Sequence, residues 1–246
     1  EVISVGVMYY AALVPCVLAA FIAQGIASAL GLESTHFVVD EIASFSFING
    51  SKFIIMSVLF ALASILLCVV LHGTSKLYTD YINNPYIRII IAGTLVIAMR
   101  YIFGTTDYLG AGSDIIARSF VTSCAWYVFL LKMLFTAVTL GGGFKGGEIV
   151  PSFFTGAAFG CLFGNLLGFS PTLCTAVGMT SVFCGVTNCP ITSLLISFEL
   201  FGYDGMPYFL LSTALSYMLS GYFGLYRSQK IVYSKYKTNY INKTTH

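Results

Sequence analysis

The sequence predicts an all-α, polytopic membrane protein built from tilted and broken helices. Of its 246 residues, 57% are hydrophobic and only 9% are charged, and the mean hydropathy is +0.87. Because about 25% of the residues in a typical soluble domain are charged, this composition excludes an ordinary soluble protein. The charges also avoid the apolar runs, several of which are shorter than the roughly 20 residues that a full helical span needs. Short, interrupted apolar segments are typical of transporters built from inverted repeats.

Eight near-continuous apolar runs are the expected helices. They cover residues 9–31, 53–72, 86–103, 119–139, 152–168, 171–187, 190–203 and 206–223. The chain opens with Glu1 in the middle of such a pattern, without an initiator methionine or a signal pattern, so we expect a fragment of a longer protein.

The composition predicts no metal, no cofactor and no nucleic-acid partner, since a net charge of +2 is too small to attract nucleic acid. The seven cysteines lie in apolar runs without the paired spacing of zinc ligands, and we expect them to be small buried hydrophobes. His36, His72 and His246 fall in expected loops or at ends and share no ligand-like spacing, so we assign them no role.

The distribution of charge predicts the topology. The loop after the first run carries Glu33, Asp40 and Glu41, whereas the tail after Tyr226 carries basic residues and no acid. This asymmetry places the C-terminus in the cytoplasm. We expect a transmembrane domain over residues 1–236 and a polar, disordered cytoplasmic tail over residues 237–246.

The middle of the chain contains a glycine-rich break and a membrane-buried cation. Residues 105–114, TTDYLGAGSD, predict a re-entrant loop, favoured over a ligand site, and a short helix capped by Ser113 or Asp114. Lys132 stands inside an apolar run, where an ammonium costs at least about 2.5 kcal/mol at the bilayer centre. It either lies near an interface or raises the positive potential around an anion path.

The strongest chemical signal is the sequence GGGFKGGEIVP over residues 141–151. Each glycine costs about 1 kcal/mol against alanine in a helix, so residues 141–148 should be non-helical. Pro151 suits the first turn of a new helix, which should begin near Val150. The free N–H groups and the positive dipole end of that turn form an anion site. The alternative, that the glycines serve helix packing, is accepted for the four-residue series Gly156, Gly160, Gly164 and Gly168.

A second break, CGVTNCP over residues 184–190, separates two apolar half-helices, and Pro190 again fits a helix start. Glu199 is the only acid in the run that follows. An intramembrane carboxylate is a functional candidate by default, but capping or pairing inside the helix bundle is the favoured interpretation.

The segment GGGFKGGEIVPSFFTGAAFG resembles the second-half pore motif of the ClC family of chloride channels and proton-coupled anion exchangers. GMTSVFCGVTNCPITSLLISFELF and SGYFGLYRSQKIVYSK are similar to the helices that follow it in that family. The resemblance implies a second inverted-repeat half of a ClC-like core, with the first half, including its gating glutamate in GREGP, absent. It implies an anion held by Glu148, Ile149 and Val150 ahead of Pro151, and by the hydroxyl of Tyr226. Gly146 and Gly147 belong to the same pore loop.

Two departures from the family pattern leave the anion open between chloride and fluoride. Ile149 stands where most members have phenylalanine. Glu148 in GGE resembles the fluoride-exporting branch, in which a threonine often stands at the position of Val150. Glu148 itself has three interpretations: it is protonated through burial, it pairs with Lys145, or it disfavours large halides and selects fluoride.

The leading hypothesis is transport of a small halide through a ClC-type pore, with protons as possible co-substrates, in a multi-pass protein of the plasma or inner membrane. Channel and proton-coupled exchanger stay open. The complete protein is expected to be a homodimer, an implication of the resemblance alone. A non-transporting scaffold or an inactive fragment is the alternative, whereas an intramembrane enzyme would need a nucleophile with a base, or metal ligands, that we do not find.

Overall fold

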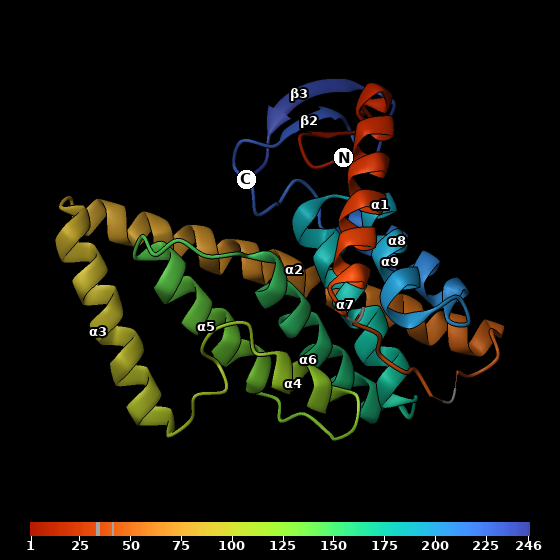
Figure 1. The fold of residues 1–246 in the computed structure, drawn as a ribbon, viewed down its shortest axis with the longest axis horizontal. Coiled ribbons are helices and arrows are strands. Elements are labelled where there is room, and N and C mark those ends of the chain that lie inside the picture. Colours follow the sequence, from red (N-terminus) through yellow and green to blue (C-terminus); the bar gives the residue numbers. More distant parts are fainter. Residues whose placement is uncertain (33–34, 41) are drawn as a thin grey trace.

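The computed structural model describes residues 1–32, 35–40 and 42–246, so Glu33 and Glu41 lie outside the described residues. The elements are a 3₁₀ turn, nine α-helices and three short strands in this part of the chain (Figure 1). The helices are α1 Leu13–Ala29, α2 Phe47–Tyr81, α3 Pro85–Phe103, α4 Ser113–Ser119, α5 Val128–Gly141, α6 Ile149–Leu167, α7 Pro171–Thr187, α8 Pro190–Phe201 and α9 Met206–Leu219. The turn η1 is Tyr10–Ala12, and the strands are β1 Ser4–Val5, β2 Lys230–Tyr233 and β3 Tyr240–Thr244. This confirms the all-α prediction.

Two helices differ from the expected runs. Helix α2 is 35 residues long and extends the run 53–72 at both ends. Its start is fixed by Ser46, whose side chain accepts a 3.3 Å hydrogen bond from the Asn49 N–H. His72 therefore lies within a helix, and not in a loop or at an end as was expected. The run 119–139 is split, because α5 begins only at Val128.

The packing of α6 along α7 forms the centre of the bundle, with α2, α5 and α9 around the pair (Figure 1). A Cβ on Gly156 would meet the backbone of Gly178, and a Cβ on Gly160 would meet the backbone of Cys174. Gly164 faces the Cys174 side chain in the same way. The expected glycine contact face is confirmed at these three positions, whereas Gly168 ends α6 with a φ of +69° and faces open space.

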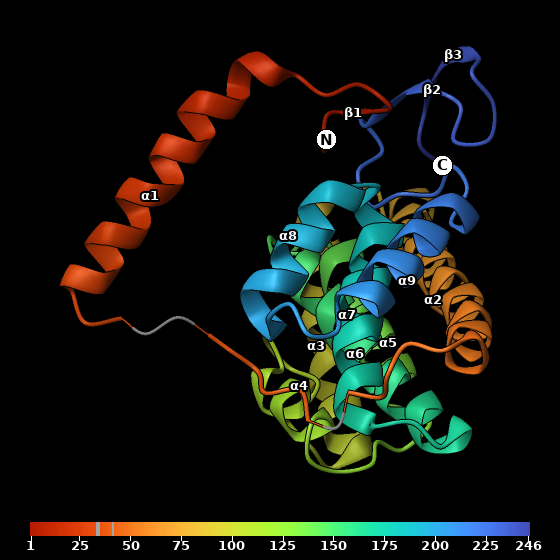
Figure 2. The same ribbon diagram turned by 90° about the vertical axis from the view of Figure 1, so that its right-hand side faces the viewer.

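Four helical segments of the described residues are long and apolar enough to cross a membrane: Tyr10–Ala29, Phe47–Tyr81, Pro85–Phe103 and Ile149–Leu167. Helices α5, α7, α8 and α9 are apolar but shorter, as the interrupted runs predicted. Helix α1 buries no residue and stands apart from the bundle (Figure 2). Cys16 on this helix is exposed, so its expected burial was wrong.

The C-terminal tail is ordered, and the disorder expected for it was wrong. Strand β3 pairs antiparallel with β2, and β1 from the N-terminal end pairs in parallel with the other edge of β2. Both chain ends therefore lie at the same end of the molecule (Figure 2). Thr245, just after β3, donates a 2.6 Å hydrogen bond from its hydroxyl to the carbonyl of Tyr226. The tail thus supports the segment that carries Tyr226.

The second predicted break is confirmed, because α7 ends at Thr187, Asn188 takes a left-handed conformation with φ of 60°, and α8 begins at Pro190. The pairing expected for Glu199 was wrong. Its side chain is exposed and has no partner within the described ranges, and only its backbone carbonyl accepts a hydrogen bond, at 3.0 Å from His36 Nδ1.

Candidate functional site

The glycine-rich loop between α5 and α6 is the local structure that the sequence predicted. Helix α5 ends at Gly141 and α6 begins at Ile149, one residue before the expected start, with Glu148 as its N-cap. Gly142 packs so closely against Ala92 of α3 that no Cβ fits, and Gly143 has a φ of +100°. Glycine is required at both positions, because a side chain would collide at the first and strain the backbone at the second.

A cavity of about 620 Å³ brings the predicted anion-site residues together. Glu148, Ile149, Val150 and Tyr226 all line it. Its remaining lining residues are Gly146, Gly147, Leu225, Arg227 and Ser228. The N–H groups of Ile149 and Val150 belong to the first turn of α6, so they have no partner inside the helix. We call this space the helix-start cavity.

The segment that carries Tyr226 is fixed by hydrogen bonds from three directions. The Leu225 N–H donates to the Val186 carbonyl of α7 at 2.8 Å, and the Leu225 carbonyl faces His72 Nε2 of α2 at 3.0 Å. The Tyr226 carbonyl accepts from Thr245. The Tyr226 side chain is half-buried, and its hydroxyl has no protein partner in the described part of the chain. It is therefore free to donate a hydrogen bond within the cavity.

Glu148 is half-buried and lines the helix-start cavity, and of its three interpretations the structure does not support the pairing with Lys145. Lys145 is exposed, and no ion pair joins the two among residues that the structure describes. Glu148 instead lines the helix-start cavity together with Tyr226. The carboxyl group is thus left to interact with whatever occupies the space beside Tyr226.

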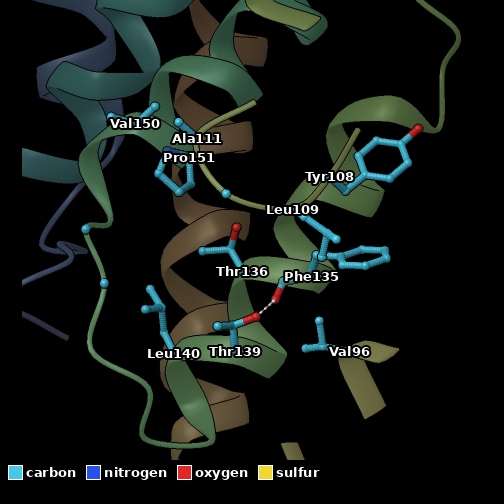
Figure 3. A pocket seen from close by; sticks show the side chains of 13 residues that line it. Val96, Tyr108, Leu109, Ala111, Phe135, Thr136, Thr139, Leu140, Val150 and Pro151 are labelled. Carbon is cyan, nitrogen blue, oxygen red and sulfur yellow. Dashed lines mark hydrogen bonds between the residues drawn. The ribbon is translucent and has the colours of Figure 1, made fainter. Parts of the chain in front are cut away.

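A second cavity of about 400 Å³ lies on the other side of the glycine-rich loop (Figure 3). Gly146, Gly147 and Val150 line both cavities, whereas Pro151 lines only this one. Helices α3 and α5, residues 108–111 and the start of α6 supply the other walls, which are mostly apolar apart from the hydroxyls of Thr136 and Thr139 (Figure 3). The glycine-rich loop therefore lines both the helix-start cavity and this second cavity.

Lys132 of α5 holds the loop that covers this second cavity. Its side chain is only 1% exposed, and its ammonium donates to the carbonyls of Tyr108 at 3.2 Å and Gly110 at 2.7 Å. The ammonium also lies 5.0 Å from the ring centroid of Phe154. The charge is therefore buried within the protein, where backbone carbonyls and an aromatic ring surround it.

The loop itself matches the predicted break, although its cap differs from the expected one. Helix α4 begins at Ser113, and its N-cap is Gly112 in a left-handed conformation with φ of 75°. Neither Ser113 nor Asp114 caps the helix with its side chain. A glycine is favoured at this position, because a Cβ there would press against the ring of Phe154.

A third, smaller cavity of about 230 Å³ contains two residues that the sequence did not predict, His72 and Arg227. Its other lining residues are Leu71, Ser75, Leu140, Gly141, Glu148 and Leu225. Glu148 thus lines both this space, which we call the His72 cavity, and the helix-start cavity. No local signal points to His72, because its role depends on contacts between distant segments. No metal-binding cluster occurs among the residues searched, which are the described ones.

Comparison with known proteins finds relatives that are described as chloride or chloride/fluoride channels. Residues 1–221 match the sequence model described as voltage gated chloride channel. A chloride/fluoride channel protein of Pseudomonas syringae pv. tomato is 31% identical over 242 residues, which are 96% of this chain and 54% of that protein. A voltage-gated ClC-type chloride channel, ClcB of Escherichia coli, is 30% identical over 101 residues, covering 38% of this chain and 24% of that protein.

A solved structure with the same fold is titled as the crystal structure of a CLC-type fluoride/proton antiporter. It superposes with a TM-score of 0.90 at 27% identity, over 93% of this chain and 58% of that chain. This chain therefore spans about half the length of the chloride/fluoride channel relative and of the antiporter structure.

Proposed function

Because the chain belongs to the voltage-gated chloride channel family, we propose that it forms the second half of a pore that moves chloride or fluoride across a membrane. Its family and its apolar helices make it an integral, multi-pass membrane protein. The observation that carries the proposal is the helix-start cavity, in which the start of α6 and Tyr226 face the same space.

The cavity offers an anion two kinds of neutral donor. The N–H groups of Ile149 and Val150 lie at the positive end of the α6 dipole, which favours a negative charge without a cationic side chain at the ion. The hydroxyl of Tyr226 adds a third donor. Neutral donors suit transport, because the site must release the anion as readily as it binds it.

The pore is incomplete with these residues alone. Transporters with inverted repeats build the ion site where the two halves meet, and this chain covers about half of its relatives. We infer that a first half completes the cavity and that the whole protein is a homodimer with its C-terminus in the cytoplasm. Support for coupling to protons comes from the similar structure, which is titled a fluoride/proton antiporter.

The test is an anion flux measurement on the complete protein in liposomes. Vesicles loaded with potassium fluoride or potassium chloride should release halide, as read by an ion-selective electrode, when valinomycin dissipates the membrane potential. Residues 1–246 alone should release no more than empty liposomes, because half of the site is missing. A complete protein that moves neither halide would support the alternative of a non-transporting scaffold and would overturn the proposal.

A further inference from the structure

We propose that His72 is the proton donor and acceptor for Glu148 within the His72 cavity. The inference deepens the proposed function and rests on it. It starts from a shared lining residue: Glu148 lines both the His72 cavity and the helix-start cavity. The same carboxyl group can therefore face an imidazole and a halide.

The hydrogen bond of the His72 ring determines which ring nitrogen can gain and lose a proton. Nε2 lies 3.0 Å from the carbonyl oxygen of Leu225. A carbonyl oxygen can only accept, so Nε2 carries a hydrogen in both the neutral and the charged imidazole. The neutral ring then has its lone pair on Nδ1, for which the described residues supply no hydrogen-bond partner. A proton is taken up and released at Nδ1.

The space between the two groups can hold water. The His72 cavity has a volume of about 230 Å³. A water molecule takes about 30 Å³ in the liquid, so several fit there. Ser75, one turn after His72 on α2, places a hydroxyl on the same wall. A water held by Ser75 and the imidazole can carry a proton to the carboxyl group of Glu148.

The transfer is a balanced exchange within the protein. The imidazolium of His72 gives the Nδ1 proton to a carboxylate oxygen of Glu148, directly or through water, so that the ring becomes neutral and Glu148 becomes a carboxylic acid. The neutral acid no longer repels an anion beside Tyr226, and its O–H can donate a hydrogen bond to that anion. Return of the proton restores the carboxylate and favours release of the anion.

The other ionisable groups that line the two cavities among the described residues are Arg227 and Tyr226. Arg227 donates a 3.0 Å hydrogen bond to the His72 carbonyl and lines both cavities, so its positive charge lies near both His72 and Glu148. Tyr226 lines only the helix-start cavity, with Glu148. Helix α5 contributes only Leu140 and Gly141 to the His72 cavity. His72 is therefore the one group lining this cavity, in the described part of the chain, that can exchange a proton with Glu148 near neutral pH.

The test measures proton and halide fluxes at the same time in liposomes that contain the complete protein. In His72→Gln, the amide still donates to the Leu225 carbonyl but cannot exchange a proton. We expect the number of protons moved per halide to fall by roughly tenfold or more, the low end of the effect of a proton-transfer group, while halide flux persists. His36→Gln is the matched control, because His36 also bonds a backbone carbonyl but lies far from the cavity, and it should leave the ratio unchanged.

The outcomes separate the inference from the proposed function. No halide flux in the wild type would contradict the proposed function. Halide flux in the wild type with an unchanged proton ratio in His72→Gln, or without any proton movement, would overturn the inference alone. If His72→Gln fails to fold, ¹⁵N NMR of the imidazole in the wild-type protein decides: Nδ1 should titrate while Nε2 stays protonated, and the reverse pattern would overturn the inference.

Discussion

Lys132 on α5 donates a 2.7 Å hydrogen bond to the carbonyl of Gly110, and this bond fixes residues 108–111 over the cavity beside the glycine-rich loop. The ammonium has no acidic partner in the part of the chain that the structure describes, so backbone carbonyls and the ring of Phe154 are its surroundings. A buried charge in such a place helps to fix the shape of the loop.

We predict that Lys132→Met destabilises the complete protein by about 2 to 6 kcal/mol, since it leaves two backbone carbonyls without their donor at about 1 to 3 kcal/mol each. Thermal unfolding in detergent, followed by size-exclusion chromatography, measures the change. Lys145→Met is the control, because Lys145 is exposed and its replacement should leave the stability of the protein unchanged. Equal melting temperatures for the two variants would contradict the role assigned to Lys132.

Gly160→Ala should destabilise the protein by about 1 to 3 kcal/mol, because the new methyl group would collide with the Cys174 backbone of α7. Gly25→Ala is the matched change, on α1, where a Cβ meets nothing within 4 Å. That variant should be neutral or more stable by about 0.5 to 1 kcal/mol, since alanine is the better helix former. The same unfolding assay compares them, and a harmless Gly160→Ala would show that α6 and α7 can separate without cost.

The starts of helices were predictable from sequence because glycine and proline act locally. Pro151 and the glycines before it placed the start of α6 within one residue, and Pro190 did the same for α8. That Glu148 and Tyr226 line one cavity was inferred only through resemblance to a family, since nothing in the spacing of two such distant residues reports their distance. His72 illustrates the limit, because its partner Leu225 is 153 positions away in the chain.

The strand in the C-terminal tail was also unpredictable, because it too depends on contacts with distant residues. Residues 240–244 are polar and carry no apolar alternation, so their order depends on pairing with β2 and on the bonds that Thr245 makes to Tyr226 and Gln229. The surroundings of Lys132 could not be predicted for a related reason. The cost of an ammonium in lipid predicts that it avoids the bilayer centre, but it says nothing of carbonyls brought to it by a loop 22 residues earlier.

Removal of residues 240–246 should weaken halide binding as well as stability. The deletion removes β3 and the 2.6 Å bond from Thr245 to the Tyr226 carbonyl, each ordinary hydrogen bond contributing about 1 kcal/mol. Thr245→Val removes only the hydroxyl and should produce a part of the same loss. Halide affinity from isothermal titration of the complete protein tests this, and unchanged affinity in the deletion would mean that the tail does not support Tyr226.

Tyr226→Phe should weaken halide binding by about 0.5 to 3 kcal/mol, the range between an ordinary hydrogen bond and one to a charged partner. This corresponds to roughly a 2- to 150-fold rise in the dissociation constant. Tyr240→Phe, an exposed tyrosine on β3, is the control and should bind as the wild type does. If the two variants bind halide equally well, the hydroxyl of Tyr226 does not contact the anion.

Glu148→Gln should change the ratio of fluoride to chloride flux. As a carboxylate, Glu148 repels every anion in the helix-start cavity, and as an acid it donates a hydrogen bond that favours fluoride, the smallest halide and the strongest acceptor. Glutamine keeps the size and a donor but loses both the charge and the exchangeable proton. Chloride flux should therefore rise relative to fluoride flux, as measured by ion-selective electrodes on liposomes of the complete protein.

The control for Glu148→Gln is Glu199→Gln, since Glu199 is the exposed carboxylate of α8 and has no partner among the residues described. Its flux ratio should equal that of the wild type. An unchanged ratio in Glu148→Gln, together with a lower protein yield, would make Glu148 a structural residue. Selection between halides would then have to come from Ile149, Val150 or the first half of the pore, because no other carboxylate lines the helix-start cavity within the described ranges.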